Sequence, residues 1–142
     1  MDLAEIARRQ LAAREIRHSV DGRSFTLRLP TRHERKLVLA RVCDEAQWRA
    51  GGVEGEAFVL PTELSMRVTR LLLERAIVGW DVTLGDVLPE VDGEAGAEPL
   101  PWSATAVPLL LDAQPQWESE LQRVFAAAEN ARSAAIEADE KN

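Results

Sequence analysis

The 142-residue chain is long enough to form one domain with its own core, and it combines a net charge of −7 with a single cysteine. One cysteine excludes an internal disulfide, and the two histidines lack the paired ligand spacing of a zinc site. The start, Met1–Glu5, is unlike a secretion signal, and no apolar run is long enough to span a bilayer. We therefore expect a cytosolic protein that requires no membrane, metal or cofactor.

The charge is unevenly distributed along the chain. Residues 1–49 hold 11 Lys or Arg against 7 Asp or Glu, a net charge of +4, whereas residues 50–142 carry a net charge of −11. A basic segment of this kind is compatible with an acidic partner, nucleic acid included. No aromatic residue alternates with the arginines to form a base-stacking platform, so nucleic acid is not expected as the partner.

The first elements are predicted to be a helix and then a β-hairpin. Asp2 followed by Glu5 is typical of a helix N-terminus. Between residues 16 and 29 the apolar period becomes two, and Asp21-Gly22 stands between the two runs as a hairpin turn would. Phe25 and the apolar residues that alternate after it should face the core. Because an isolated hairpin is marginal in water, this one must lie on helices or join a partner's sheet.

Two longer helices are predicted next. Thr31 and Glu34 form a capping box that opens a helix ended by Gly51-Gly52, and residues 53–60 read as a connector. The following helix begins at Thr62 and ends at Gly79. Its expected core positions lie at helical spacing: Leu64, Val68, Leu71, Leu72, Ala76 and Val78.

The last third of the chain is predicted to hold a loop and two helices. Residues 81–98 form a long acidic loop rich in glycine. Ser103 begins a short helix that Pro108 should distort, and Pro115 begins the final helix. Residues 137–142 form a polar tail that should fray. The expected fold is a small single-domain helical bundle over residues 1–136, mainly α with one N-terminal β-hairpin (α+β).

No catalytic or metal-binding constellation is predicted. His33 and Cys43 are separated by about 15 Å along one helix, too far for a nucleophile and its base. The carboxylates of the 81–98 loop lack the spacing of a calcium loop, and no glycine-rich phosphate loop follows a strand. A non-enzymatic protein is the expectation.

Tryptophans are the remaining candidates for function, because Trp is enriched where interfaces gain most of their binding energy. Trp80 and Trp102 flank the acidic loop, and Trp117 opens the apolar stripe of the last helix. We predict a partner-binding site that contains these three residues and two further members of the stripe, Leu121 and Phe125.

The order of these features resembles the tail assembly chaperones and related small tail-region proteins of long-tailed bacteriophages and prophages. The resemblance is carried by the helix end at residues 77–82, by Pro99-Leu100-Pro101-Trp102-Ser103, and by the charged terminus Glu140-Lys141-Asn142. It covers the C-terminal half well and the Phe25–Pro30 strand loosely.

This resemblance implies a non-enzymatic protein of the host cytoplasm. It would bind the tape-measure protein, keep that protein's apolar helices soluble, and help recruit tail tube subunits. The alternative is a structural virion component, a head–tail or baseplate adaptor in which the hairpin joins a neighbour's sheet. A small accessory enzyme is a third class, and a homo-oligomer is compatible with each.

Overall fold

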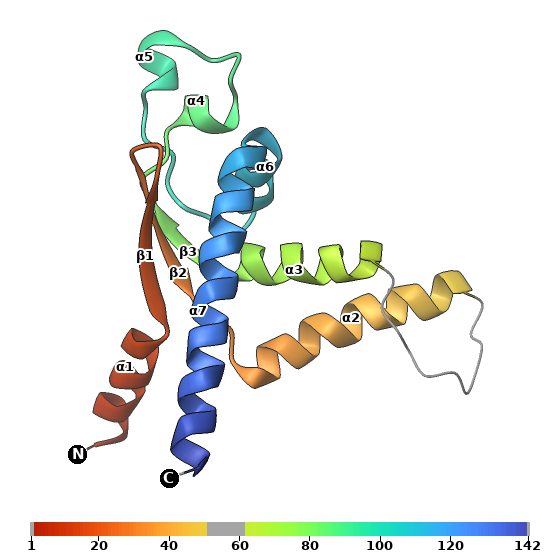
Figure 1. Cartoon of the computed structure of the whole chain (residues 1–142). Coiled ribbons are helices and arrows are strands. Elements are labelled where there is room, and N and C mark those ends of the chain that lie inside the picture. Colours follow the sequence, from red (N-terminus) through yellow and green to blue (C-terminus); the bar gives the residue numbers. More distant parts are fainter. Residues whose placement is uncertain (1, 51–61, 142) are drawn as a thin grey trace.

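The computed structural model describes residues 2–50 and 62–141. The protein is a mainly helical α+β domain with a small antiparallel sheet, as the sequence predicts. Figure 1 shows the sheet and the vertical helix α7 as the body, with α1 at one end and the α4–α5 segment at the other. The elements are α1 (Leu3–Ala13), β1 (Glu15–Val20), β2 (Arg23–Arg28), α2 (Arg32–Ala50), α3 (Thr62–Ala76), β3 (Ile77–Trp80), α4 (Leu84–Val87), α5 (Gly93–Gly96), α6 (Ala106–Ala113) and α7 (Pro115–Lys141).

The predicted hairpin is confirmed. β1 and β2 pair antiparallel, and Val20 lies opposite Arg23 across the two-residue turn. Asp21 and Gly22 have φ angles of 48° and 79°, the two positive values that a type I′ turn requires. Phe25 has no exposed surface, so the face predicted to be covered is covered.

The sheet has a third strand, which the sequence pattern does not predict. The helix predicted to run to Gly79 ends at Ala76, and residues 77–80 form β3, antiparallel to β2. Ile77 is fully buried beside Leu27 in the strand register. A short apolar run next to a helix is compatible with the helical and with the strand periodicity. Whether it forms a strand therefore depends on whether a neighbouring strand can pair with it. Here β2 is that partner.

Helix α7 packs against the sheet and closes the core. The rings of Trp117 and Phe25 meet edge to face, with centroids 6.1 Å apart. The Trp117 indole Nε1 donates to Asp21 Oδ2 over 2.7 Å, so the ring is fixed to the hairpin turn. The fully buried side chains of this core are Phe25, Leu27, Val38, Val42, Leu73, Ile77, Val82, Val107, Leu110, Leu111 and Leu121.

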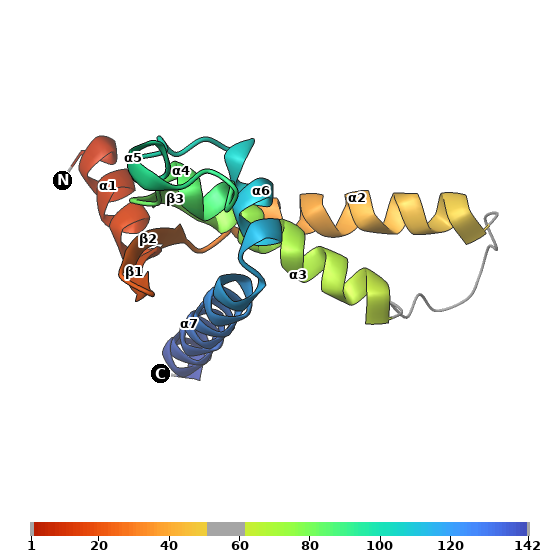
Figure 2. The same ribbon diagram turned by 90° about the horizontal axis from the view of Figure 1, so that it is seen from above.

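Helices α2 and α3 project from the body as an arm, which is seen from above in Figure 2. The capping box is confirmed: Glu34 N donates to Thr31 Oγ1 (3.1 Å), and Thr31 N donates to Glu34 Oε1 (3.2 Å). Of the core positions predicted in α3, Leu72 and Ala76 are buried. Leu64 is only half-buried, and the fully buried Leu73 was not among the predicted positions. The expected stop at Gly51-Gly52 and the connector 53–60 lie outside the described residues.

The C-terminal elements differ from expectation in two places. Pro108 does not break α6, because it lies in the first turn, where its missing N–H has no helical acceptor to lose. Helix α7 continues through Lys141, whereas residues 137–142 were expected to fray. The last turns are rich in Ala and Glu, which have high helix propensity.

Candidate interaction surface

Trp80 and Trp102 hold together the two segments that flank the acidic loop. The Trp80 indole Nε1 donates to the carbonyl oxygen of Leu100 (2.9 Å). The Trp102 indole Nε1 donates back to the carbonyl oxygen of Ile77 (3.0 Å). The backbone N–H of Leu100 adds a third bond, to the Val82 carbonyl (3.0 Å). Each indole therefore fixes the backbone of the other segment.

Trp102 also contributes to a surface groove. Its side chain remains 39% exposed, although its N–H is bonded. The groove has a volume of about 460 Å³ and lies where α2, α3, β3 and the start of α6 meet. We call it the Trp102 groove, and its lining residues are Glu34, Arg41, Leu71, Glu74, Arg75, Val78, Trp102, Ala104 and Pro108. This lining combines apolar side chains with charges of both signs, which is typical of a protein interface.

Arg70 of α3 connects two helices that line this groove, α3 and α6, and joins both to α7. Its guanidinium donates to Glu118 of α7 (3.0 Å), to Asp112 of α6 (2.9 Å) and to the Pro108 carbonyl (3.1 Å). Partial burial alone would lower the pKa of Arg70, but the hydrogen bonds and charges of Asp112 and Glu118 outweigh it and raise the pKa. Helices α3, α6 and α7 are thus joined through one cation.

Glu34 links the rim of the groove to the start of α2. Partial burial alone would raise the pKa of Glu34, but hydrogen bonds from Thr31 and the charge of Arg14 lower it below its usual value. The Arg14 guanidinium donates to Glu34 Oε1 over 3.2 Å and to the Leu29 carbonyl over 2.8 Å. Glu34 is therefore held as a carboxylate at a fixed position.

The structure separates the five predicted partner-binding residues into two groups. Trp117, Leu121 and Phe125 are 6%, 0% and 4% exposed and belong to the core, so they are removed from a surface site of this chain. Their stripe packs against the sheet. The helical spacing of the stripe does not show that the sheet would cover it. Trp80 is half-buried, and Trp102 is the most exposed of the five.

The other walls of the Trp102 groove were not predicted. Leu71 had been assigned to the buried stripe of a helix, and Val78 to a helix that is a strand instead. Only the pair Trp80 and Trp102, on both sides of one loop, indicated this region in the sequence. Leu71, Val78 and Pro108 come from three elements, and nothing in their spacing shows that they meet.

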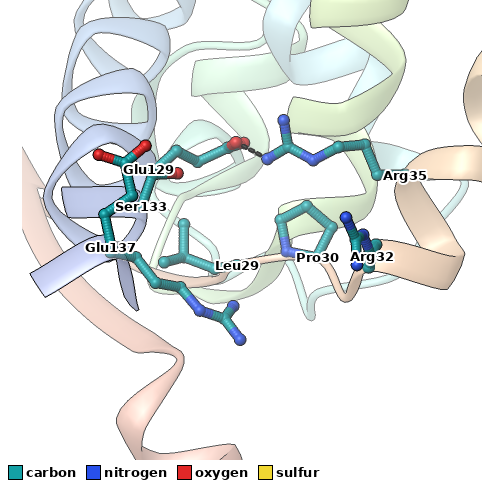
Figure 3. A pocket seen from close by; sticks show the side chains of 8 residues that line it. Leu29, Pro30, Arg32, Arg35, Glu129, Ser133 and Glu137 are labelled. Atoms are coloured by element: carbon teal, nitrogen blue, oxygen red, sulfur yellow. Dashed lines mark ion pairs between the residues drawn. The ribbon is translucent and has the colours of Figure 1, made fainter. Parts of the chain in front are cut away.

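A second hollow lies at the end of the molecule that holds both termini. Two adjoining cavities of about 490 and 720 Å³ share Leu29 and Arg132. Figure 3 shows the first, where Arg35 of α2 reaches across to Glu129 of α7 and forms an ion pair. We call it the Leu29 cleft, and its lining residues are Leu29, Pro30, Arg32, Arg35, Glu129, Arg132, Ser133 and Glu137.

Several other polar side chains of the described residues are held in pairs that join distant elements. Within residues 2–50 and 62–141, no group of three His, Cys, Asp or Glu side chains is placed to hold a metal ion. In the acidic loop, Asp86 pairs with Arg23 (2.8 Å), and Asp81 accepts from the backbone N–H of Ser24. His18, which had no predicted role, lies 3.2 Å from Glu120 and joins β1 to α7.

Comparison with protein-family models, with characterised proteins and with solved structures finds no match to this chain. No described helix is both long and apolar enough to cross a bilayer.

Proposed function

We propose that this protein is a tail assembly chaperone of a long-tailed bacteriophage or prophage. In this proposal it binds an apolar helix of the tape-measure protein in the Trp102 groove, holds that helix in solution in the cytoplasm, and promotes tail tube assembly. No catalytic step is proposed.

The observation that carries the proposal is the contact between two of the motifs on which the family resemblance rests. Residues 77–82 and 99–103 are bonded to each other through Trp80 and Trp102. Val78 from the first motif and Trp102 from the second then line the same groove. Two separate motifs of the family resemblance therefore contribute to one surface, and this supports a binding role for that surface.

The chemistry of the groove suits an amphipathic helix. Its lining offers the apolar Leu71, Val78 and Trp102. The same lining also holds charged side chains, among them Glu34 and Arg75. A helix that places its apolar face in such a groove keeps its polar face in water. The hydrogen bonds of Arg70 hold α3 and α6 together before a partner binds, which should lower the ordering cost of binding.

The decisive experiment is co-purification of the tagged full chain from infected or induced cells, with identification of the proteins recovered. The tape-measure protein should be recovered with the wild type. Ala104→Glu should abolish recovery without loss of fold, because Ala104 is exposed and lines the groove. Leu109→Glu is the matched control, since Leu109 is 58% exposed and lies outside the groove, and it should bind normally.

Trp102→Ala is a second probe of the same surface. It should reduce binding by roughly 2 kcal/mol or more, as expected for an interface anchor. It also removes the hydrogen bond to the Ile77 carbonyl, so a loss of about 0.5–1.5 kcal/mol in unfolding free energy should accompany it. Recovery of the tape-measure protein by both Ala104→Glu and Trp102→Ala at wild-type levels would contradict the proposal.

A structural virion component is the second candidate, and the sheet topology favours it. The strand order is β1-β2-β3, so β1 is an edge strand, and no described strand pairs with its outer side. An edge of this kind can accept a strand from a neighbouring subunit. Purified particles distinguish the two functions: a virion component is present in them, whereas a chaperone is absent.

A further inference from the structure

We propose that this protein self-associates head to tail, with the segment of residues 84–98 of one copy entering the Leu29 cleft of the next. We call that segment the acidic tip. The inference goes beyond the chaperone proposal, because it concerns two surfaces that lie outside the Trp102 groove.

The Leu29 cleft has the chemistry of a site for an acidic segment with an apolar residue. Its floor is Leu29, which is 4% exposed, and Pro30, which is buried. Arg35 is already paired with Glu129 across the cleft. Arg32 and Arg132 stand at the beginning of α2 and on α7, and neither forms an ion pair with any residue that the structure describes. Three arginines against two carboxylates, Glu129 and Glu137, leave the lining net positive around an apolar floor, and this complements such a segment.

The acidic tip carries the complementary groups. Leu88 is 41% exposed and is followed by Pro89 and Glu90, both exposed. Asp92 and Glu94 are exposed too, and no carboxylate of these three is ion-paired within the described part of the chain. The tip therefore offers one apolar side chain surrounded by negative charge, in a segment that projects from the body (Figure 1).

The tip is also held in one shape before it meets a partner. Arg23 pairs with Asp86 over 2.8 Å, and Gln114 Nε2 donates to the Asp86 carbonyl over 2.9 Å. Gly96 packs so closely on the Val91 carbonyl that a Cβ there would clash with it. Because the segment is preorganised, little conformational entropy is lost when it docks.

The geometry favours a second copy as the occupant. Figure 1 places α4 and α5 at one end of the molecule and the C-terminal part of α7, which lines the cleft, at the other, so one chain cannot fill its own cleft. Contact between two different surfaces of identical chains repeats from copy to copy and yields rings or open filaments.

The test is sedimentation velocity on the purified full chain over a range of concentrations, at low and at high salt. At low salt the mass should rise with concentration to at least that of a dimer, and high salt should reverse this because it screens surface charge. The cleft variant Arg32→Glu/Arg132→Glu and the tip variant Glu90→Arg/Glu94→Arg should each remain monomeric. A mixture of the two should associate, because each then meets a surface of opposite charge.

The matched control is Arg8→Glu/Arg17→Glu, which changes the net charge as much as the cleft variant does, at exposed positions outside the cleft. It should associate like the wild type, and circular dichroism should show the same helix content in all variants. The proposal is overturned if the wild type is monomeric throughout, if either reversal still associates, or if the mixture stays monomeric. An acidic segment of another protein would then be the better occupant. Partner recovery through the Trp102 groove is measured separately and does not depend on this result.

Discussion

Helices α1 and α7 are both amphipathic in sequence, but the apolar stripe of α7 is buried whereas that of α1 is exposed. Both are polar helices with an apolar stripe and an acidic residue in the first turn. In α7 the stripe residues Trp117, Leu121 and Phe125 are buried. In α1 no residue is buried, and Leu3 is 85% exposed. An amphipathic pattern therefore shows which side of a helix is suited to a partner, and it does not show whether this chain provides one.

The sheet explains the difference. α7 runs along the face that carries Phe25, and Trp117 is bonded to Asp21 in the hairpin turn. α1 precedes β1 directly and buries no residue, and its capping bond from Glu5 N to Asp2 Oδ1 (2.7 Å) stabilises it locally. One helix is held by tertiary packing, and the other by its cap and its own backbone.

The largest effect should come from the residue on which α7 packs. Phe25→Ala removes a fully buried ring that contacts Trp117, so the free energy of unfolding should fall by about 3–5 kcal/mol. Chemical denaturation of the purified variant measures this. A loss below about 1 kcal/mol would mean that the sheet face is not what holds α7.

Leu121→Ala tests the α7 stripe itself. The side chain has no exposed surface, so its truncation leaves a cavity and should cost about 2–5 kcal/mol of unfolding free energy. The same denaturation experiment applies, with an unchanged slope against denaturant expected if the native state keeps its compactness. Stability equal to that of the wild type would place α7 away from the core in solution.

Glu120 lies on α7 beside β1 and should give a smaller, pH-dependent effect. The hydrogen bond from Arg123 (2.6 Å) is the main cause that lowers the pKa of Glu120 to about 2, and His18 adds to it. A depressed carboxylate pKa contributes stability above its unfolded value, about 4.3, and that contribution is lost as the pH falls toward about 2.

Melting temperatures between neutral pH and about pH 2 provide the measurement for this carboxylate. Glu120→Gln should have a shallower acid decline than the wild type and a similar stability once both are fully protonated. Parallel acid limbs for the two proteins would show that the Arg123 and His18 contacts do not persist in solution.

The smallest effect is expected in α1. Leu11→Ala truncates a leucine that is 39% exposed, so the free energy of unfolding should change by less than about 0.5 kcal/mol. Leu121→Ala is its matched partner, with the same substitution on the other amphipathic helix. A cost for Leu11→Ala that depends on protein concentration would show that another copy covers the α1 stripe in solution.

Features that depend on three or four adjacent residues were predictable from the chain alone. Asp21-Gly22 adopts the turn because its backbone needs two positive φ angles, and Thr31 with Glu34 caps α2 through bonds between near neighbours. The alternation around Phe25 likewise identified the covered face. These outcomes depend on local sterics and local hydrogen bonds, which a sequence encodes directly.

Features that join distant segments were not predictable in this way. Residues 77–80 become β3 because β2, about fifty residues earlier in the chain, supplies the hydrogen bonds. Trp102 and Trp117 each follow a proline-containing segment, and each donates its indole N–H to a distant acceptor. One is 39% exposed and the other 6%, because α7 lies on the sheet while the segment before α6 lies at its edge beside the arm. The burial of a side chain depends on which other segments pack against it, and only the tertiary structure decides that.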